Sequence, residues 1–250
     1  MRKEPLLAML LGVFTLLSCA NPIEDIRSEN SITRTKAAAQ FTEDASSDQI
    51  QKLIHIMQAT EDNGVRASCA DALGYAHATS AVPALIDALK VAEWRVRRST
   101  ANALGRIADP RAIDPLIEVL DQEITDPNLS EGKRCAVWAF VNLKSEKVVP
   151  VLIHMLSNNP GKDNSEKIDY TTALLAAMGA QKDKRAIPAI ADHLDSRAGS
   201  QAAGALGKIV DVDFTDDADP FRLPMPSPAK AKEWLQKHPE LLKPQDKKDR

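Results

Sequence analysis

The amino-acid sequence predicts an all-α solenoid, a row of about five stacked antiparallel helix pairs. Three observations support this fold class: an alanine-rich unit that recurs along the chain, a proline-led amphipathic segment after each copy, and a composition poor in aromatic residues. Aromatic residues make up only 4% of the 250 residues, whereas 44% are hydrophobic. A core of small and medium side chains favours closely packed helices over β-sandwiches.

The recurring unit is clearest in two segments that align without a gap, RASCADALG at 66–74 and RRSTANALG at 97–105. Weaker copies follow, and an alanine marks the same position in each. The equivalent alanines are Ala72, Ala103, Ala139, Ala177 and Ala205. Their spacings of 31, 36, 38 and 28 residues fall in the range of helical repeat proteins.

A second segment follows each unit, at residues 81–89, 112–120, 148–156 and 186–194. In the first of these, Val82, Leu85, Ile86 and Leu89 have the spacing of one helix face, and the proline lies in the first turn, where no hydrogen bond is lost. Glycines between the segments are predicted to end the first helices in a left-handed conformation; they are Gly74, Gly105, Gly179 and Gly207. Neither helix of a pair can bury its apolar face alone, so the pairs must stack.

The run from Val96 to Leu120 resembles a HEAT repeat, in the short form of the phycobilisome lyase subgroup. The resemblance covers residues 48–210 and implies a right-handed solenoid. It also implies that residues 49–57 are a lone second helix from a degenerate first repeat. Arg66 and Arg97 match the arginine that in HEAT repeats pairs with acids of neighbouring repeats.

An arginine cluster lies in one of the clearest repeats and comprises Arg95, Arg97, Arg98, Arg106 and Arg111. The resemblance favours internal ion pairs for these side chains. The alternative is a basic binding patch. The sequence disfavours that alternative because Asp109, Asp114 and Glu118 lie nearby and would dilute the positive field.

The N-terminus has the order of a bacterial export signal. Arg2 and Lys3 precede an apolar run at 5–17 that is too short to span a bilayer. The run ends in Leu-Leu-Ser-Cys19, which resembles a lipobox and implies a signal peptide at 1–18 and acylation of Cys19, with palmitate among the chains. Because Ala20 is not aspartate, the resemblance points to the outer membrane, facing the periplasm. The alternative is an ordinary signal peptide.

The flanking segments are predicted to be simpler. Residues 19–47 are expected to form a flexible tether, with a short helix around 35–41 as the alternative. Residues 211–227 are an acidic, proline-rich linker, and residues 228–250 are a capping helix with a charged tail. The aspartates from Asp211 onward lack the glycine and glutamate positions of an EF-hand, so a solvated turn is favoured over a calcium site.

The residue types predict no catalytic or metal site and no cofactor. The five histidines have no metal-ligand spacing, and no His-Glu dipeptide of the kind in deoxyhypusine hydroxylase occurs. Cys69 and Cys135 lie among alanines and are expected to be buried free thiols. A formal charge of −3 disfavours nucleic acid. A monomer is expected.

The exposed side of the second helices is the predicted binding face, which the resemblance places on the concave side. A polar column is expected there, with an apolar spot beside it. The predicted partner-binding residues are His55, Asp87, Glu118, Val119, Val151, His154, Met155 and Asp192. Trp138 is expected to cover the loop at 121–132, with exposure toward a partner as the alternative.

These expectations favour a lipid-anchored, non-catalytic scaffold that binds a protein or peptide of the bacterial cell envelope. The alternative, from the subgroup that the repeats resemble, is a bilin lyase or isomerase that handles a chromophore. The export signal and the lack of a pigment-directed motif count against it. DNA binding of the kind found in alkylation-repair HEAT proteins is disfavoured by the acidic charge.

Overall fold

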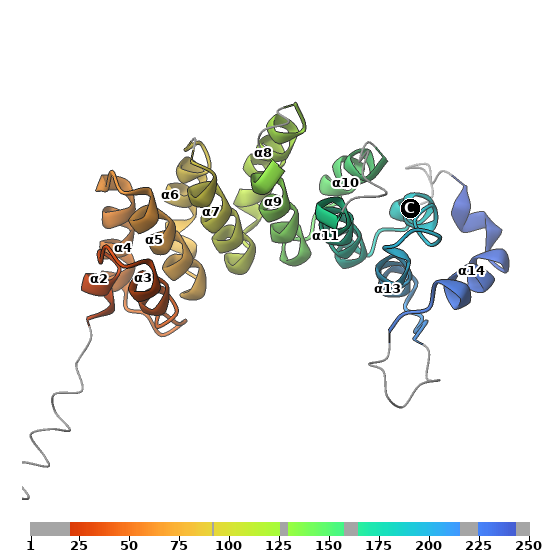
Figure 1. Cartoon of the computed structure of the whole chain (residues 1–250), viewed down its shortest axis with the longest axis horizontal. Coiled ribbons are helices and arrows are strands. Elements are labelled where there is room, and N and C mark those ends of the chain that lie inside the picture. The colour runs from red at the N-terminus through yellow and green to blue at the C-terminus, as the bar shows by residue number, and fades with distance from the viewer. Residues whose placement is uncertain (1–20, 92, 126–129, 158–164, 216–224, 244–250) are drawn as a thin grey trace, which may run out of the picture.

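The chain folds into a single elongated row of helices, with α2 and α3 at one end and α14 at the other (Figure 1). The computed structural model describes residues 21–91, 93–125, 130–157, 165–215 and 225–243, except for the side chains of 121–125, 130–135 and 165–169. Within these ranges the regular secondary structure is helical, and one isolated β-bridge joins Thr215 and Pro226. The predicted all-α solenoid is confirmed.

The row has two layers. The first layer contains α3 (Ser31–Ala38), α5 (Asn63–Tyr75), α7 (Trp94–Ile107), α9 (Ser130–Asn142), α11 (Ser165–Gln181) and α13 (Gly199–Val210). The second layer contains α4 (Ser47–Ala59), α6 (Val82–Ala88), α8 (Ile113–Thr125), α10 (Val148–Ser157) and α12 (Ile187–Ala191). The described chain therefore holds five helix pairs, from α3/α4 to α11/α12, followed by α13.

Turns of 3-10 helix lead into several of the second helices: η1 (Thr79–Ala81), η2 (Pro110–Ala112) and η4 (Lys184–Ala186). Pro83 and Pro188 lie in the first turn of α6 and α12, as predicted. A proline there has a suitable φ and lacks only an N–H that would have no helical partner. This turn allows each second helix to fold back across its first helix.

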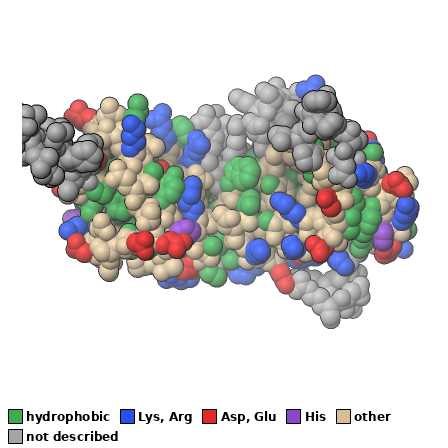
Figure 2. All heavy atoms as spheres, turned by 90° about the horizontal axis from the view of Figure 1, so that it is seen from below, with side chains coloured by type: hydrophobic (Ala, Val, Ile, Leu, Met, Phe, Trp, Pro, Cys, Tyr) green, Lys and Arg blue, Asp and Glu red, His purple; other side chains and the backbone are tan. Residues whose placement is uncertain are grey.

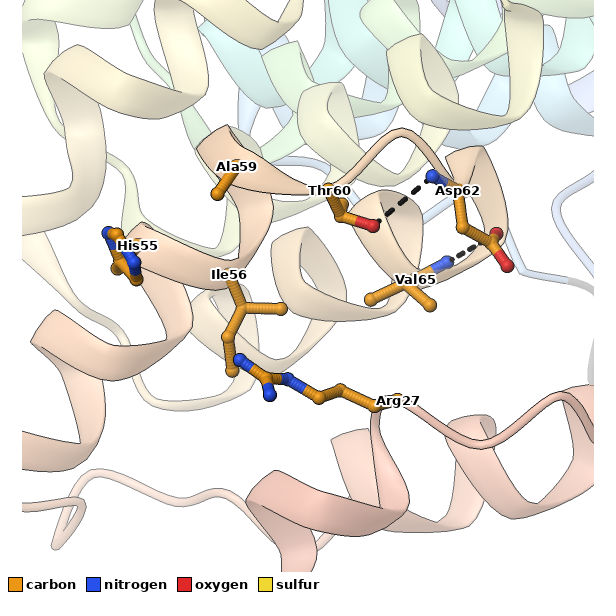
Figure 3. A pocket seen from close by; sticks show the side chains of 7 residues that line it. All are labelled: Arg27, His55, Ile56, Ala59, Thr60, Asp62 and Val65. Carbon is orange, nitrogen blue, oxygen red and sulfur yellow. Dashed lines mark hydrogen bonds between the residues drawn. The ribbon is translucent and has the colours of Figure 1, made fainter.

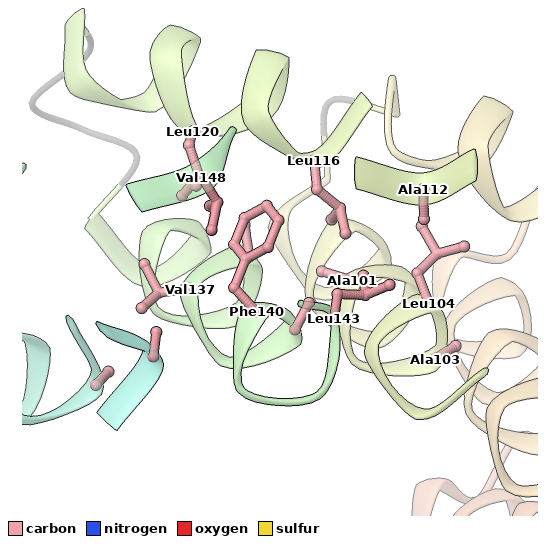
Figure 4. Close-up of a cluster of buried hydrophobic side chains, with 14 of the residues drawn as sticks. Ala101, Ala103, Leu104, Ala112, Leu116, Leu120, Val137, Phe140, Leu143 and Val148 are labelled. Carbon is pink, nitrogen blue, oxygen red and sulfur yellow. The ribbon is translucent and has the colours of Figure 1, made fainter. Parts of the chain in front are cut away.

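The core is a continuous seam of aliphatic side chains between the two layers. Phe140 of α9 is fully buried together with Leu116 and Leu120 of α8 and Val148 of α10 (Figure 4). Each of these neighbours comes from a different pair or from the partner helix of the same pair. No pair therefore encloses its own core, and burial depends on stacking.

The first-layer helices touch through glycine and alanine. A Cβ atom added to Gly74 would lie 2.7 Å from the Cα of Ala103, and one added to Gly105 would lie 2.7 Å from the Cα of Ala139. Gly179 stands in the same relation to Ala205, at 2.9 Å. The repeated glycine of one pair therefore faces the repeated alanine of the next, and a side chain at the glycine would push the helices apart.

The prediction that these glycines end their helices in a left-handed conformation is wrong. None of the described glycines has a positive φ. The left-handed residues come three or four positions later and are His77, Ala108, Lys182 and Asp211. The helices run past Gly74, Gly105 and Gly179 because each of these glycines is needed inside its helix, where the next helix approaches most closely.

An Asp-x-Arg turn ties one pair to the preceding pair. The Arg111 guanidinium donates to both carboxylate oxygens of Asp109, at 2.9 and 2.7 Å, and to the carbonyl of Thr79, at 3.1 Å. The hydrogen bonds from Arg111 hold the pKa of the Asp109 carboxyl below its usual range. The same arrangement recurs with Asp183, Arg185 and the carbonyl of Glu146.

The two arginines expected to pair with acids both donate to backbone carbonyls. Arg66 donates to the carbonyl of Met57 at 3.2 Å and to Oδ1 of Asn63 at 2.9 Å. Arg97 donates to the carbonyl of Val91 at 2.9 Å. The prediction of an acidic partner is wrong for Arg66, whose donors instead satisfy carbonyls at the end of the preceding second helix.

The predicted tether at 19–47 is wrong for the described part of that segment. Residues 22–25 form α2 (Pro22–Asp25), and α3 packs against α5 in the first layer. Ile26 and Phe41 are buried in the common core. Helix α4 is therefore not a lone second helix, because α3 is its partner. Ile26 and Phe41 are too far apart in the sequence to show a helical period, yet both are buried.

The C-terminal end is covered by α14 (Pro228–Gln236) and η5 (Pro239–Leu242), which pack against α13 and α12. Ala231 and Leu235 of α14 are buried. Trp234 stacks on His238, with ring centroids 3.9 Å apart, and meets Phe214 edge-on at 6.0 Å. Phe214 is buried, so the predicted linker at 211–227 is partly packed; residues 216–224 lie outside the described ranges.

We expect Gly105→Ala to lower the free energy of unfolding by about 1–3 kcal/mol, because the new methyl group would overlap the α9 backbone. In an open helix the same change would stabilise the protein by about 1 kcal/mol. Chemical denaturation followed by circular dichroism measures the difference.

Gly204→Ala is the matched control, since its Cβ would meet only the ring of Pro226, at 3.2 Å. We expect the stability of that variant to stay within about 1 kcal/mol of the parent. Equal effects of the two substitutions would contradict the role assigned to the helix contact at Gly105.

Candidate functional site

The second-helix face carries the predicted polar column. His55, Asp87, Glu118 and His154 lie at equivalent positions of α4, α6, α8 and α10, and Asp192 lies at the C-terminal end of α12. All five are exposed. Asp87 lies 3.7 Å from Lys90 in an exposed ion pair. Stacked helices lie about 10 Å apart, so five successive helices give a face roughly 40 Å long.

The predicted apolar spot beside this column is only partly correct. Met155 is buried, with 4% of its surface exposed, and its sulfur lies 3.8 Å from the hydroxyl of Tyr170 in α11. The prediction of an exposed Met155 is wrong because the next first helix covers it. Val119 and Val151 are half-buried and remain accessible.

A different apolar row lies on the other side of the column. Ile54, Ile86, Ile117 and Ile153 each immediately precede a polar-column residue, and all four are half-buried. They pack against the core with one side and meet solvent with the other. Sequence reasoning assigned these positions to the buried stripe, although their regular recurrence beside the polar column could have indicated a shared face. We call these four side chains the isoleucine row.

The surface view shows how the hydrophobic groups are distributed. Seen from below, hydrophobic side chains reach the surface in separate patches between basic and acidic ones (Figure 2). Small separate patches are usual on folded proteins and do not by themselves mark a binding site.

A depression with a volume of about 370 Å³ lies at the N-terminal end of this face. Ile56, Ala59 and Val65 form its apolar wall, and the Arg27 side chain extends toward Ile56 (Figure 3). His55 links the depression to the polar column. The carboxylate of Asp62, at another edge, accepts hydrogen bonds from the backbone of Gly64 and Val65 and so caps α5.

The first-layer face differs in charge. On α7, the side chains of Arg95, Arg98 and Arg106 are exposed, and Asn102 between them is half-buried. The guanidinium carbon of Arg106 lies 4.4 Å from the ring centroid of Tyr75 on α5. Trp138 holds the position of Asn102 on α9 and is 45% exposed; the side chains of the loop that it was expected to cover are outside the described set.

Asp71 on α5 is an acidic group close enough to Arg98 and Arg106 to interact with their charges. Burial raises the pKa of the Asp71 carboxyl, although a hydrogen bond from the Ser99 hydroxyl at 3.1 Å and the charges of Arg106 and Arg98 oppose the rise. At neutral pH the folded structure therefore disfavours the charged form of the Asp71 carboxyl.

The other reactive side chains give no catalytic arrangement. Cys69 is a buried free thiol, and burial raises its pKa to about 12, so it stays protonated. The side chain of Cys135 lies outside the described set. In the described part of the chain, no three histidine, cysteine or acidic side chains gather as a metal site would require.

Residues 50–127 match the family model of HEAT repeats. This HEAT-like segment runs from α4 through α8. No curated protein sequence matches the chain.

Three solved structures align with most of this chain at low sequence identity. A chain from the complex of CpcE and CpcF of phycocyanin lyase from Nostoc sp. PCC7120 is 20% identical, with a TM-score of 0.44, and the match covers 88% of this chain and 93% of that one. An engineered protein is 18% identical, with a TM-score of 0.48 and coverages of 89% and 95%. Human deoxyhypusine hydroxylase, in complex with glycerol, is 15% identical, with a TM-score of 0.36 and coverages of 94% and 99%.

We expect Asp71→Asn to raise the melting temperature at pH 7 by about 1–3 °C. An acid whose pKa is raised by folding binds its proton more tightly in the folded state, so it lowers stability as the pH rises from its unfolded pKa through its folded pKa. The difference between variant and parent should therefore shrink as the pH falls toward 4, the ordinary aspartate range.

Asp87→Asn is the control, since Asp87 is exposed on the other layer. Its melting temperature should follow that of the parent at every pH. If the melting temperature of Asp71→Asn also followed that of the parent across this pH range, the destabilisation assigned to the buried Asp71 carboxylate would be absent.

Proposed function

We propose that the protein is a lipid-anchored, non-catalytic scaffold of the bacterial cell envelope that binds another envelope protein through its second-helix face. The observation that carries this proposal is the polar column beside the isoleucine row, repeated at equivalent positions of successive helices. Because the same kinds of residue recur in successive helix pairs, this surface extends along the row as one long contact area.

The two parts of this face have complementary roles. Burial of the half-exposed isoleucines would contribute about 25 cal/mol to the binding free energy for each square ångström of apolar surface that a partner covers. The polar column supplies charges that select the partner and its orientation. Because Asp87 and Glu118 occupy neighbouring pairs, we expect the partner to place basic groups opposite α6 and α8.

Attachment to the membrane is proposed from the sequence around Cys19, which lies outside the described ranges. Among the described helices, none is both long and apolar enough to cross a bilayer. Several acyl chains on one cysteine would give stable attachment, whereas one chain binds only marginally. With Ala20 after the cysteine, we propose the outer membrane, facing the periplasm, as the location.

Photo-crosslinking in intact cells tests the binding face. We expect a photoreactive amino acid at Asp87 or at His154 to capture the same partner, because both lie in the polar column two pairs apart. Reactive groups at Lys144 and Gln236, exposed in a turn and on α14, are the controls and should not capture it. Capture of one protein with equal yield from all four positions would overturn the assignment.

The anchor is tested by substitution of the cysteine. We expect Cys19→Ser to abolish incorporation of labelled palmitate and to shift the protein from the membrane fraction to the soluble fraction. Cys69→Ser is the matched control, because Cys69 is buried in α5, and that variant should still be labelled. Palmitate on the Cys19→Ser protein would rule out this attachment site.

A further inference from the structure

The exposed side of α7 forms a basic ridge. Arg95, Arg98 and Arg106 lie along one line of the helix, with Asn102 completing the three- and four-residue spacing. The ridge is about 16 Å long at 1.5 Å per residue. Among the side chains that the structure describes, none forms a salt bridge with these three arginines.

The acids that follow the arginines in the sequence are elsewhere in the fold, and Glu93, which precedes them, caps the start of α7 by accepting a hydrogen bond from the N–H of Val96. Asp109 is held by Arg111 in the turn after α7. Asp114 and Glu118 belong to α8, in the other layer, where Asp114 pairs with Lys147 at 2.9 Å. The dilution of charge that the sequence predicted therefore does not occur on the ridge. Asp71, a half-buried acid on α5, is the carboxyl whose charge does interact with Arg98 and Arg106.

Aromatic rings position the guanidinium groups. Arg106 lies over Tyr75 at 4.4 Å, and Arg95 lies over Trp94 at 5.3 Å. A guanidinium that stacks on a ring keeps its N–H groups free at its edge. Trp138 adds exposed aromatic surface on the neighbouring helix α9.

We propose that this ridge is a second docking surface and that its partner is an acidic, extended segment of another protein. Arg98 and Arg106 lie eight residues apart, about 12 Å along the helix, and four residues of an extended chain advance about 13 Å. Carboxylates on alternate residues of such a segment would therefore reach both arginines. Each arginine can hold a carboxylate through two parallel hydrogen bonds.

Other anionic surfaces fit less well. Lipid-binding segments usually carry clusters of four to eight basic residues, whereas the ridge has three exposed arginines on a chain with net charge −3. Affinity for nucleic acid rises with the number of phosphates that basic side chains neutralise, and the ridge offers three arginines. An acidic peptide needs only the ridge itself.

Fluorescence anisotropy with the full-length chain tests this surface. The probe is a labelled octapeptide of alternating glutamate and serine; its controls have the same glutamates in one block, or lysine in place of glutamate. We expect the alternating peptide to bind, and its affinity to fall as the salt concentration rises toward about 0.15 M. Arg98→Glu with Arg106→Glu should weaken binding about tenfold or more.

Lys52→Glu with Lys90→Glu makes the same change in net charge on the other layer and should change binding less than about twofold. Circular dichroism checks that each variant is folded, and Arg98→Lys with Arg106→Lys should bind with intermediate strength. The proposal would be overturned if both charge-reversed pairs weakened binding equally, if the block peptide bound as tightly as the alternating peptide, or if the alternating peptide did not bind. So would recruitment of phosphatidylglycerol vesicles, but not the peptide, through Arg98 and Arg106.

Discussion

The close contact between glycine and alanine in the first layer is the constraint on which the rest of the solenoid depends. At Gly74, Gly105 and Gly179, the next helix lies so near that even a methyl group has no room. Contact at this distance fixes both the spacing and the register of neighbouring first helices. The second helices touch one another much less, so their positions follow from those of the first helices.

This arrangement gives the protein two faces of different chemical character. The loosely spaced second helices leave the isoleucine row half-exposed beside the polar column, and the adjacent first helices display the arginines of α7. Both faces are supported by a core that is shared between pairs, so their geometry is fixed by the whole row. A solenoid of this kind can present a long surface without any mobile segment having to order on binding.

Several predictions went wrong for one reason: a repeated residue can have more than one physical role. Glycine suits both a left-handed helix end and a close contact between helices, and the sequence pattern of Gly74 is the same in either case. Met155 stands beside an exposed histidine on α10, yet Tyr170 of another pair covers it. The residues around Ile26 and Phe41 show no helical period, yet they are buried against α4 and α5.

The sequence by itself determined the helical class and the exposure of the polar column, because both follow from local periodicity and from the need of each pair to bury its apolar face. Only the tertiary structure decided which neighbours cover a given side chain and how charges are divided between the layers. Glu118 and Arg106 are twelve residues apart in the chain, but α7 and α8 belong to different layers. Distance in space, which sets both burial and electrostatic interaction, depends on the stacking of the pairs.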